Sequence, residues 1–182
     1  MSFFEEKLDG QIIYEGKILK LNVDSVILPD GKTAKREYIN HSGGAAVLYV
    51  ENGKVLLVKQ FRYAYGKEIY EIPAGKLEKG EDPVLAAKRE LEEEPGYVAK
   101  SLTELFKLYP TPGYSDEIIY VYLAENCLNG SINPDEDEFV ECELIELEKV
   151  CKMIESGEIC DAKTVAAVYK YLSDYSRRQS NL

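Results

Sequence analysis

Three glutamates stand at helical spacing near the middle of the chain. Glu90, Glu93 and Glu94 occupy relative positions 0, 3 and 4, so on a helix they share one stripe. Like charges at this spacing destabilise a bare helix, and Arg89 beside them can pair with Glu93. An isolated run of this kind is ordinarily a solvated acidic face. The surrounding sequence decides between a solvated face and a functional site.

Two neighbouring features favour a metal site over a solvated face. A glycine-rich loop that contains Glu81 leads into the predicted helix, and a second acidic cluster, residues 135–138, follows about forty residues later. Oxygen ligands on a rigid helix, completed by a carboxylate from a loop, suit hard divalent cations such as Mg²⁺. Such cations neutralise phosphate charge and polarise an attacking water, so the pattern indicates phosphoryl chemistry.

The glutamate stripe needs a helix, and the sequence marks both of its ends. Asp82 is the predicted N-cap, Pro83 stands at the first helical position, and Pro95-Gly96 ends the helix. Apolar residues recur at helical spacing and predict a stripe that faces the core, formed by Val84, Ala87 and Leu91.

Strands surround this helix in the sequence. The first forty residues read as strands around a turn at Pro29-Asp30-Gly31, and Asn52-Gly53 is a two-residue hairpin signal between two strands that are apolar on both faces. Such strands are predicted to lie inside a sheet. Further strands are predicted at 68–73, 102–109, 117–125 and 140–147. Two helices close the chain, one near 147–157 and one from Asp161, with a face formed by Val165, Val168, Tyr169 and Leu172. A mixed α/β domain results.

Composition limits the function. The 182 residues suit one domain with a sizeable core, and a net charge of −11 disfavours nucleic acid as a partner. No apolar run approaches the roughly 20 residues of a membrane span, and the start lacks a basic signal-peptide head, so we expect a cytoplasmic protein. Four cysteines without CxxC spacing are expected to be reduced, mostly buried thiols, and His41, the single imidazole, to pack in a loop or the core.

The segment from Gly75 to Tyr97 resembles the Nudix box, G-x5-E-x7-R-E-U-x-E-E-x-G-U, in which U is a bulky apolar residue. The fixed positions are all filled, by Gly75, Glu81, Arg89, Glu90, Leu91, Glu93, Glu94 and Gly96. The resemblance implies a Nudix-type α/β/α sandwich with a mixed sheet, preceded by a small antiparallel N-terminal sheet. It also implies a hydrolase that cleaves diphosphates linked to another moiety, usually a nucleoside, with Mg²⁺ or Mn²⁺ as cofactor.

Features beyond the box are similar to the ADP-ribose pyrophosphatase branch of the family. Pro112 lies sixteen residues beyond Gly96, and the similarity continues through VKQFRYAYGKEIYEIPAGKLEKGE, DEDEFVE and DAKTVAAVYKYL. This resemblance implies an N-terminal β-sheet region at residues 1–42 for dimerisation and substrate contact, and a Nudix hydrolase domain at 43–182. It implies a homodimer through the N-terminal sheet, and hydrolysis of ADP-ribose to AMP and ribose 5-phosphate.

The resemblance also implies a metal-ligand set. Glu90 and Glu94 would be the principal ligands, with the backbone carbonyl of Ala74, and Glu93 would be a ligand or a supporting group. Arg89 would orient the glutamates. ADP-ribose carries about two negative charges, so a site lined by glutamates requires two or three divalent ions to accept it.

Roles for the remaining residues follow from the same resemblance. The catalytic base would come from the acidic loop, where Glu136 and Glu138 both fit and Glu138 is preferred. Arg36 and Arg62 match residues that hold the substrate phosphates, although each would otherwise be an ordinary strand-surface charge. The remaining substrate contacts would come from Glu117, near the terminal ribose, and from Pro112; Glu81 would steady the loop.

One position departs from the family. Relatives commonly read EEETGY where this chain reads EEEPGY, and proline disfavours helical geometry at Glu94. Reduced activity is one hypothesis; the effect is small if the helix already ends there.

Three alternatives remain open. The chain could act on another nucleoside diphosphate derivative, such as a sugar nucleotide, NADH or a dinucleoside polyphosphate. It could be a non-catalytic, ADP-ribose-sensing Nudix domain, or an acidic scaffold with a chance carboxylate helix. Metal-dependent stabilisation by ADP-ribose would exclude the scaffold.

Overall fold

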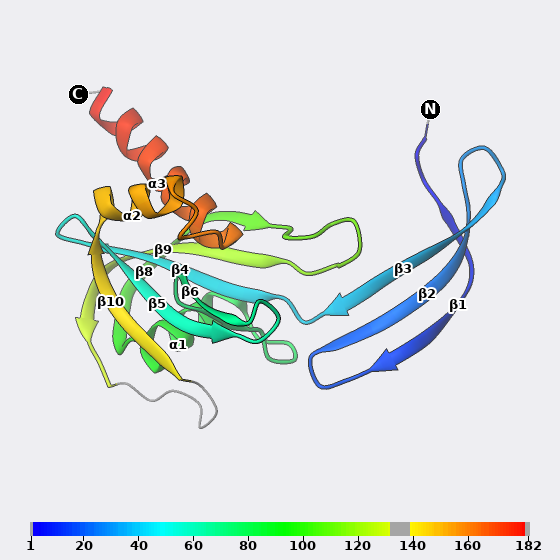
Figure 1. Ribbon diagram of the computed structural model, residues 1–182, viewed down its shortest axis with the longest axis horizontal. Coiled ribbons are helices and arrows are strands. Elements are labelled where there is room, and N and C mark those ends of the chain that lie inside the picture. Colours follow the sequence, from blue (N-terminus) through cyan, green and yellow to red (C-terminus); the bar gives the residue numbers. More distant parts are fainter. Residues whose placement is uncertain (1, 132–138, 181–182) are drawn as a thin grey trace. The chain divides into compact units, whose positions relative to one another are not determined.

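The computed structural model describes residues 2–131 and 139–180 in two compact units. One unit comprises the chain up to Gly43 together with Tyr109–Ile118. The other comprises Gly44–Leu108 and the chain from Ile119 onward. Figure 1 labels the strands and helices of each unit.

The N-terminal unit is an antiparallel sheet, as predicted. Its strands, β1 (Glu6–Glu15), β2 (Leu19–Ile27) and β3 (Thr33–His41), pair in the order β1-β2-β3. Alternate residues of β2 are buried, whereas every residue of β1 is exposed. The loop 109–118 joins this unit because its backbone hydrogen-bonds to Ile39, which donates its N–H to the Tyr114 carbonyl at 2.8 Å.

The second unit is built on a seven-stranded mixed sheet. Its main order is β10-β5-β4-β9-β8; β6 pairs with β5 and β7 with β4. The strands are β4 (Gly44–Glu51), β5 (Lys54–Arg62), β6 (Lys67–Glu71), β7 (Ala74–Lys76), β8 (Tyr97–Leu108), β9 (Ile119–Asn129) and β10 (Val140–Glu146). Strands β4 and β9 run parallel. The hairpin around Asn52-Gly53 is confirmed, with φ of 50° and 77° at its two residues, and both of its strands lie inside the sheet.

Helices cover both faces of this sheet (Figure 1). Alternate residues of β4 divide between two cores: Val47 packs with α1 (Pro83–Glu93), and Leu48 packs with α2 (Leu147–Glu155) and α3 (Ala162–Ser180). The period of two along a strand sends side chains to opposite faces, so one strand serves both cores. The predicted α/β/α sandwich with a mixed sheet is confirmed. Among the described residues, none of the helices combines the length and apolar character needed to cross a lipid bilayer.

Four details of the sequence prediction are wrong. Val84 is 37% exposed and Tyr169 is 45% exposed, because Ala86 and Ala167 occupy the buried faces of their helices instead. Strand β7 was not expected, since three residues show no periodicity. The cysteines are reduced but not mostly buried: Cys142 and Cys160 are exposed, and the other two are half-buried.

Candidate active site

Helix α1 begins and ends where the sequence predicts. The Asp82 side chain accepts the N–H of Val84 at 2.8 Å, and Pro83 opens the first turn. The helix ends at Glu93, and Glu94 keeps helical geometry as the C-cap, with φ −75° and ψ −66°. The helix therefore already ends before Pro95, which is the case in which we expect the effect of the proline to be small. The Gly96 N–H bonds to the Glu92 carbonyl at 3.0 Å across the proline, with φ of 76° at Gly96.

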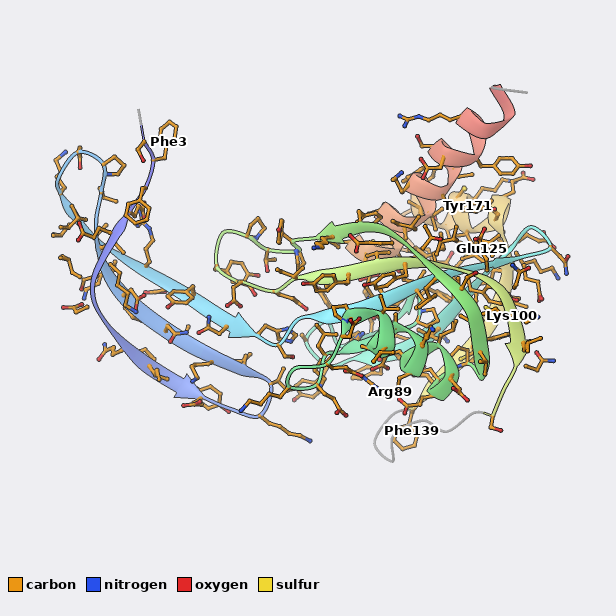
Figure 2. The ribbon with its side chains drawn as sticks, turned by 180° about the vertical axis from the view of Figure 1, so that it is seen from behind. Phe3, Arg89, Lys100, Glu125, Phe139 and Tyr171 are labelled. Atoms are coloured by element: carbon orange, nitrogen blue, oxygen red, sulfur yellow. The ribbon has the colours of Figure 1, made fainter. Side chains whose placement is uncertain are left out.

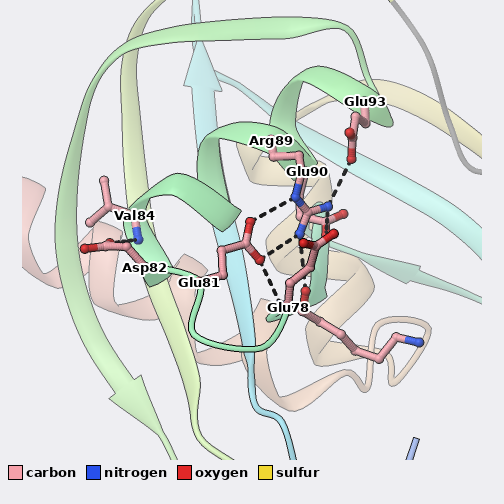
Figure 3. Close-up of polar contacts among 8 residues, drawn as sticks. Glu78, Glu81, Asp82, Val84, Arg89, Glu90 and Glu93 are labelled. Atoms are coloured by element: carbon pink, nitrogen blue, oxygen red, sulfur yellow. Dashed lines mark hydrogen bonds and ion pairs between the residues drawn. The ribbon is translucent and has the colours of Figure 1, made fainter. Parts of the chain in front are cut away.

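Arg89 is the centre of the charged cluster on this helix (Figures 2 and 3). Its Nε and Nη2 donate to the two carboxylate oxygens of Glu81, at 3.1 and 3.2 Å. Its Nη1 donates to Glu90 at 2.7 Å and to Glu93 at 3.0 Å, and Nη2 also reaches the Lys76 carbonyl at 3.3 Å. One guanidinium therefore connects the box loop to the glutamate stripe.

The charges of this cluster stabilise one another. The bond to Glu81 and the neighbouring Glu90 and Glu93 raise the pKa of Arg89. The bond from Arg89, with the Glu78 N–H at 2.9 Å, lowers the pKa of Glu81 below its ordinary value. The Glu81 carboxylate therefore stays ionised at neutral pH.

Glu90 lies tightly against the backbone that precedes the helix. It is only 7% exposed, and a Cβ placed on Gly75 would come within 1.9 Å of its Oε1. Only glycine permits this approach. Gly75 follows Ala74 directly, so Glu90 is held beside the peptide whose carbonyl the resemblance assigns to a metal. Glu94 is 3% exposed.

The donor set fits a hard divalent cation. Buried carboxylates and a backbone carbonyl are the ligands such ions prefer, and a carboxylate is retained in the interior only where positive charge offsets its desolvation. Over residues 2–131 and 139–180, no three His, Cys, Asp or Glu side chains are already grouped as metal ligands. Glu90 and Glu93 are instead held by Arg89. Glu136 and Glu138 lie outside the described residues.

A second charged cluster, not anticipated from the sequence, joins strands β5 and β6 to helix α3. This Glu71 cluster consists of Arg62, Glu71, Asp161, Lys163 and Thr164. Arg62 donates from Nε and Nη2 to the two oxygens of Glu71 at 2.6 and 2.8 Å, and Lys163 also bonds Glu71. Lys163 lies 3.0 Å from Asp161. The charge of Glu94 contributes to the raised pKa of Arg62, after the bond to Glu71, so Arg62 lies within electrostatic range of the glutamate stripe.

The other predicted substrate contacts lie in the N-terminal unit. Arg36 forms a paired hydrogen bond with Glu5, at 2.8 and 2.5 Å. Pro112 is exposed in the loop 109–118, and a carboxylate oxygen of Glu117 lies 3.5 Å from Nδ1 of His41. His41 accepts the Gly43 N–H through the same Nδ1 at 3.1 Å, which agrees with a loop-packing role.

Two known families match the chain. The NUDIX domain family matches residues 40–168, and the nucleoside diphosphate sugar hydrolase N-terminal domain matches residues 5–39. Nudix hydrolases generally use divalent metals.

Curated relatives match over nearly the whole length. An ADP-ribose pyrophosphatase of Bacillus subtilis is 49% identical over 172 residues, which cover 92% of this chain and 93% of that protein. A methanol dehydrogenase activator of Bacillus methanolicus is 44% identical, with 91% of each chain covered.

A solved structure has the same fold. A crystal structure of an ADP compounds hydrolase superposes with a TM-score of 0.84 at 18% identity, covering 98% of this chain and 97% of that one. With the filled box on α1, the family matches show that this chain belongs to the Nudix hydrolase family.

Proposed function

We propose that the chain hydrolyses the diphosphate of ADP-ribose to AMP and ribose 5-phosphate. The observation that carries the proposal is the complete box cluster, with Arg89 bonded to Glu81, Glu90 and Glu93, in a chain 49% identical to an ADP-ribose pyrophosphatase. A scaffold would have no need of carboxylates as buried as those of Glu90 and Glu94.

In this proposal Glu90, Glu94 and the Ala74 carbonyl hold Mg²⁺ or Mn²⁺, with Glu93 as a further or supporting ligand. Two or three such ions supply the positive charge that polarises a water and stabilises the leaving phosphate. Arg89 fixes the rotamers of the glutamates. The close Gly75–Glu90 approach keeps one carboxylate at the strand edge.

The base and the phosphate contacts are assigned by the resemblance. Glu138, with Glu136 as the second candidate, accepts the proton of the attacking water. Arg62 presents its Nη1 edge to a phosphate, since its Nε and Nη2 are engaged with Glu71. Arg36 is the second phosphate contact.

The substrate assignment is tested by phosphate release. Purified chain is incubated with Mg²⁺ and ADP-ribose, GDP-mannose, NADH or a dinucleoside polyphosphate, and the products are coupled to a phosphatase. We expect fast turnover of ADP-ribose that a chelator abolishes. Faster turnover of another compound would replace the substrate and keep the mechanism, whereas silence across the panel would overturn enzymatic function.

We also propose a homodimer through the N-terminal sheet, acting in the cytoplasm. The ten residues of β1 are exposed along one edge of the sheet and include Leu8, Ile12 and Ile13 at 52–54% exposure. Phe3 before the strand is 86% exposed (Figure 2). An exposed apolar edge strand of this length is ordinarily covered. A second copy of the chain is the occupant proposed here, and its presence is tested below.

A further inference from the structure

Glu71 is a buried carboxylate that depends on two cations. It is 2% exposed at the end of β6, where desolvation would raise its pKa, but the bonds and charges of Arg62 and Lys163 together hold that pKa below its ordinary value. Lys163 is itself 7% exposed at the start of α3. The positive charges of Arg62 and Lys163 therefore offset the free-energy cost of burying the Glu71 carboxylate.

The two cations differ in what else they can reach. Arg62 bonds Glu71 through its Nε and Nη2 edge, while its side chain remains 41% exposed. Lys163 is enclosed between Glu71 and Asp161. With both cations present, their formal charges balance those of Glu71 and Asp161. Without Lys163, Arg62 alone would neutralise Glu71, and the cluster would carry one net negative charge beside an anionic substrate.

The same cluster also holds the segment between β6 and β7, which leads to the box. Thr164 accepts the N–H of Ile72 through its Oγ1 at 2.8 Å and donates that hydroxyl to Asp161 at 2.6 Å. The next carbonyl, that of Pro73, accepts the Val47 N–H at 2.9 Å. Ala74 and Gly75 follow. The N-terminus of α3 is thus anchored to the segment against which Glu90 packs.

We propose that Lys163 is a positioning residue for diphosphate recognition, because by neutralising Glu71 it keeps the charge and the open edge of Arg62 available to the substrate. This inference rests on the proposed function, in which Arg62 holds a phosphate. Lys163 does not touch the substrate; it acts through Arg62.

A double-mutant cycle tests this role. In Lys163→Met we expect KM for ADP-ribose to rise about tenfold while kcat, normalised to the folded fraction from circular dichroism, stays within about threefold. In an Arg62→Met background the same change should raise KM by less than about twofold, because the residue it acts through is gone. Lys170→Met, which removes a half-exposed lysine from the same helix, is the matched control and should leave both constants unchanged.

A charge rescue separates positioning from packing. Glu71→Gln in the Lys163→Met background removes the negative charge that neutralises Arg62. KM should therefore return to within about threefold of the wild-type value. Additive KM effects in the Arg62 cycle, a fall in kcat at unchanged KM, or no rescue would each overturn the inference.

Should Lys163→Met fail to fold, Asp161→Asn serves in its place. Asparagine retains a capping oxygen, and Lys163 then donates to Glu71 alone, so KM should stay level or fall; a severalfold rise would overturn the inference.

If the wild-type chain hydrolyses another panel compound, the double-mutant cycle is measured with that compound. If it hydrolyses none, the variants of the cycle are compared by the Kd of ADP-ribose, measured by calorimetry. Failure of the proposed function is thereby seen separately from failure of the role of Lys163.

Discussion

At the scale of single residues, Arg89 offsets the repulsion between neighbouring glutamates. Three carboxylates converge on its guanidinium, and without it Glu90 and Glu93 would repel one another at adjacent positions of one helical stripe. Its fork of donors fits this task because Nε and Nη2 take Glu81 as a pair while Nη1 remains for the stripe. A lysine could not bridge the loop and the helix in this way.

Glu90→Gln tests the metal role. The amide keeps the volume against Gly75 but removes the charge, so we expect kcat to fall by about 100-fold or more while the fold persists. The matched control is Glu92→Gln, on the exposed face of the same helix, which should keep wild-type kinetics. Equal losses in both variants would show that helix stability, not the metal role, explains the result. The measurement is phosphate release with Mg²⁺.

The pH dependence of stability tests the Arg89 bonds. The pKa of Glu81 is lowered in the folded chain, so below its ordinary value the unfolded chain binds more protons than the folded one. The free energy of unfolding should therefore fall as pH drops from about 5 to about 3. In Arg89→Met the pKa of Glu81 returns toward its ordinary value and the slope should be shallower. Urea titrations at a series of pH values measure this; an unchanged slope would contradict it.

At the scale of elements, the short strand β7 fixes the position of the Glu90 carboxylate, which packs against Gly75. Gly75→Ala would place a Cβ within 1.9 Å of the Glu90 carboxylate, so that carboxylate must move, and we expect kcat to fall at least about tenfold. Gly53→Ala is the control, since its φ of 77° makes it costly to folding while nothing lies within 4 Å of the added atom. Activity that falls only in parallel with thermal stability, in both variants alike, would refute the positional explanation.

The end of α1 bears on the departure at Pro95. Glu94 keeps helical dihedrals, and its N–H still bonds to the Glu90 carbonyl at 3.2 Å. The helix ends at this C-cap, so Pro95 interrupts no further helical turn. We therefore expect Pro95→Thr to change kcat and KM by less than about threefold. A large gain in kcat on restoring threonine would show that proline displaces the Glu94 side chain.

Elements with local signals were predictable from the sequence. The Asp82-Pro83 start of α1 and the Asn52-Gly53 hairpin depend on neighbouring residues, and both are confirmed. The Glu71 cluster was not predictable, because Glu71 and Lys163 lie 92 positions apart and no period links them. Its available signal was a charged residue inside otherwise apolar segments. The roles of Arg36, Glu117 and Glu138 stay predictions.

At the scale of the whole molecule, the net charge of −11 opposes an anionic substrate. The two arginines proposed to contact the phosphates are themselves paired with glutamates, Arg36 with Glu5 and Arg62 with Glu71. Each carboxylate sets the orientation of its guanidinium. Metal ions are then required to supply the surplus of positive charge, which is why activity should depend steeply on their concentration.

The exposed strand β1 carries the last prediction, for the assembly. If a second copy covers this edge, the chain in solution should have twice the 20.6 kDa mass of one chain, by sedimentation equilibrium. A variant with Leu8→Lys and Ile12→Lys should have the single-chain mass, because two charges would be desolvated in the interface. Glu6→Lys adds the same side chain to the same strand without removing apolar surface, and should remain dimeric. A wild-type chain that sediments as a monomer would exclude the dimer.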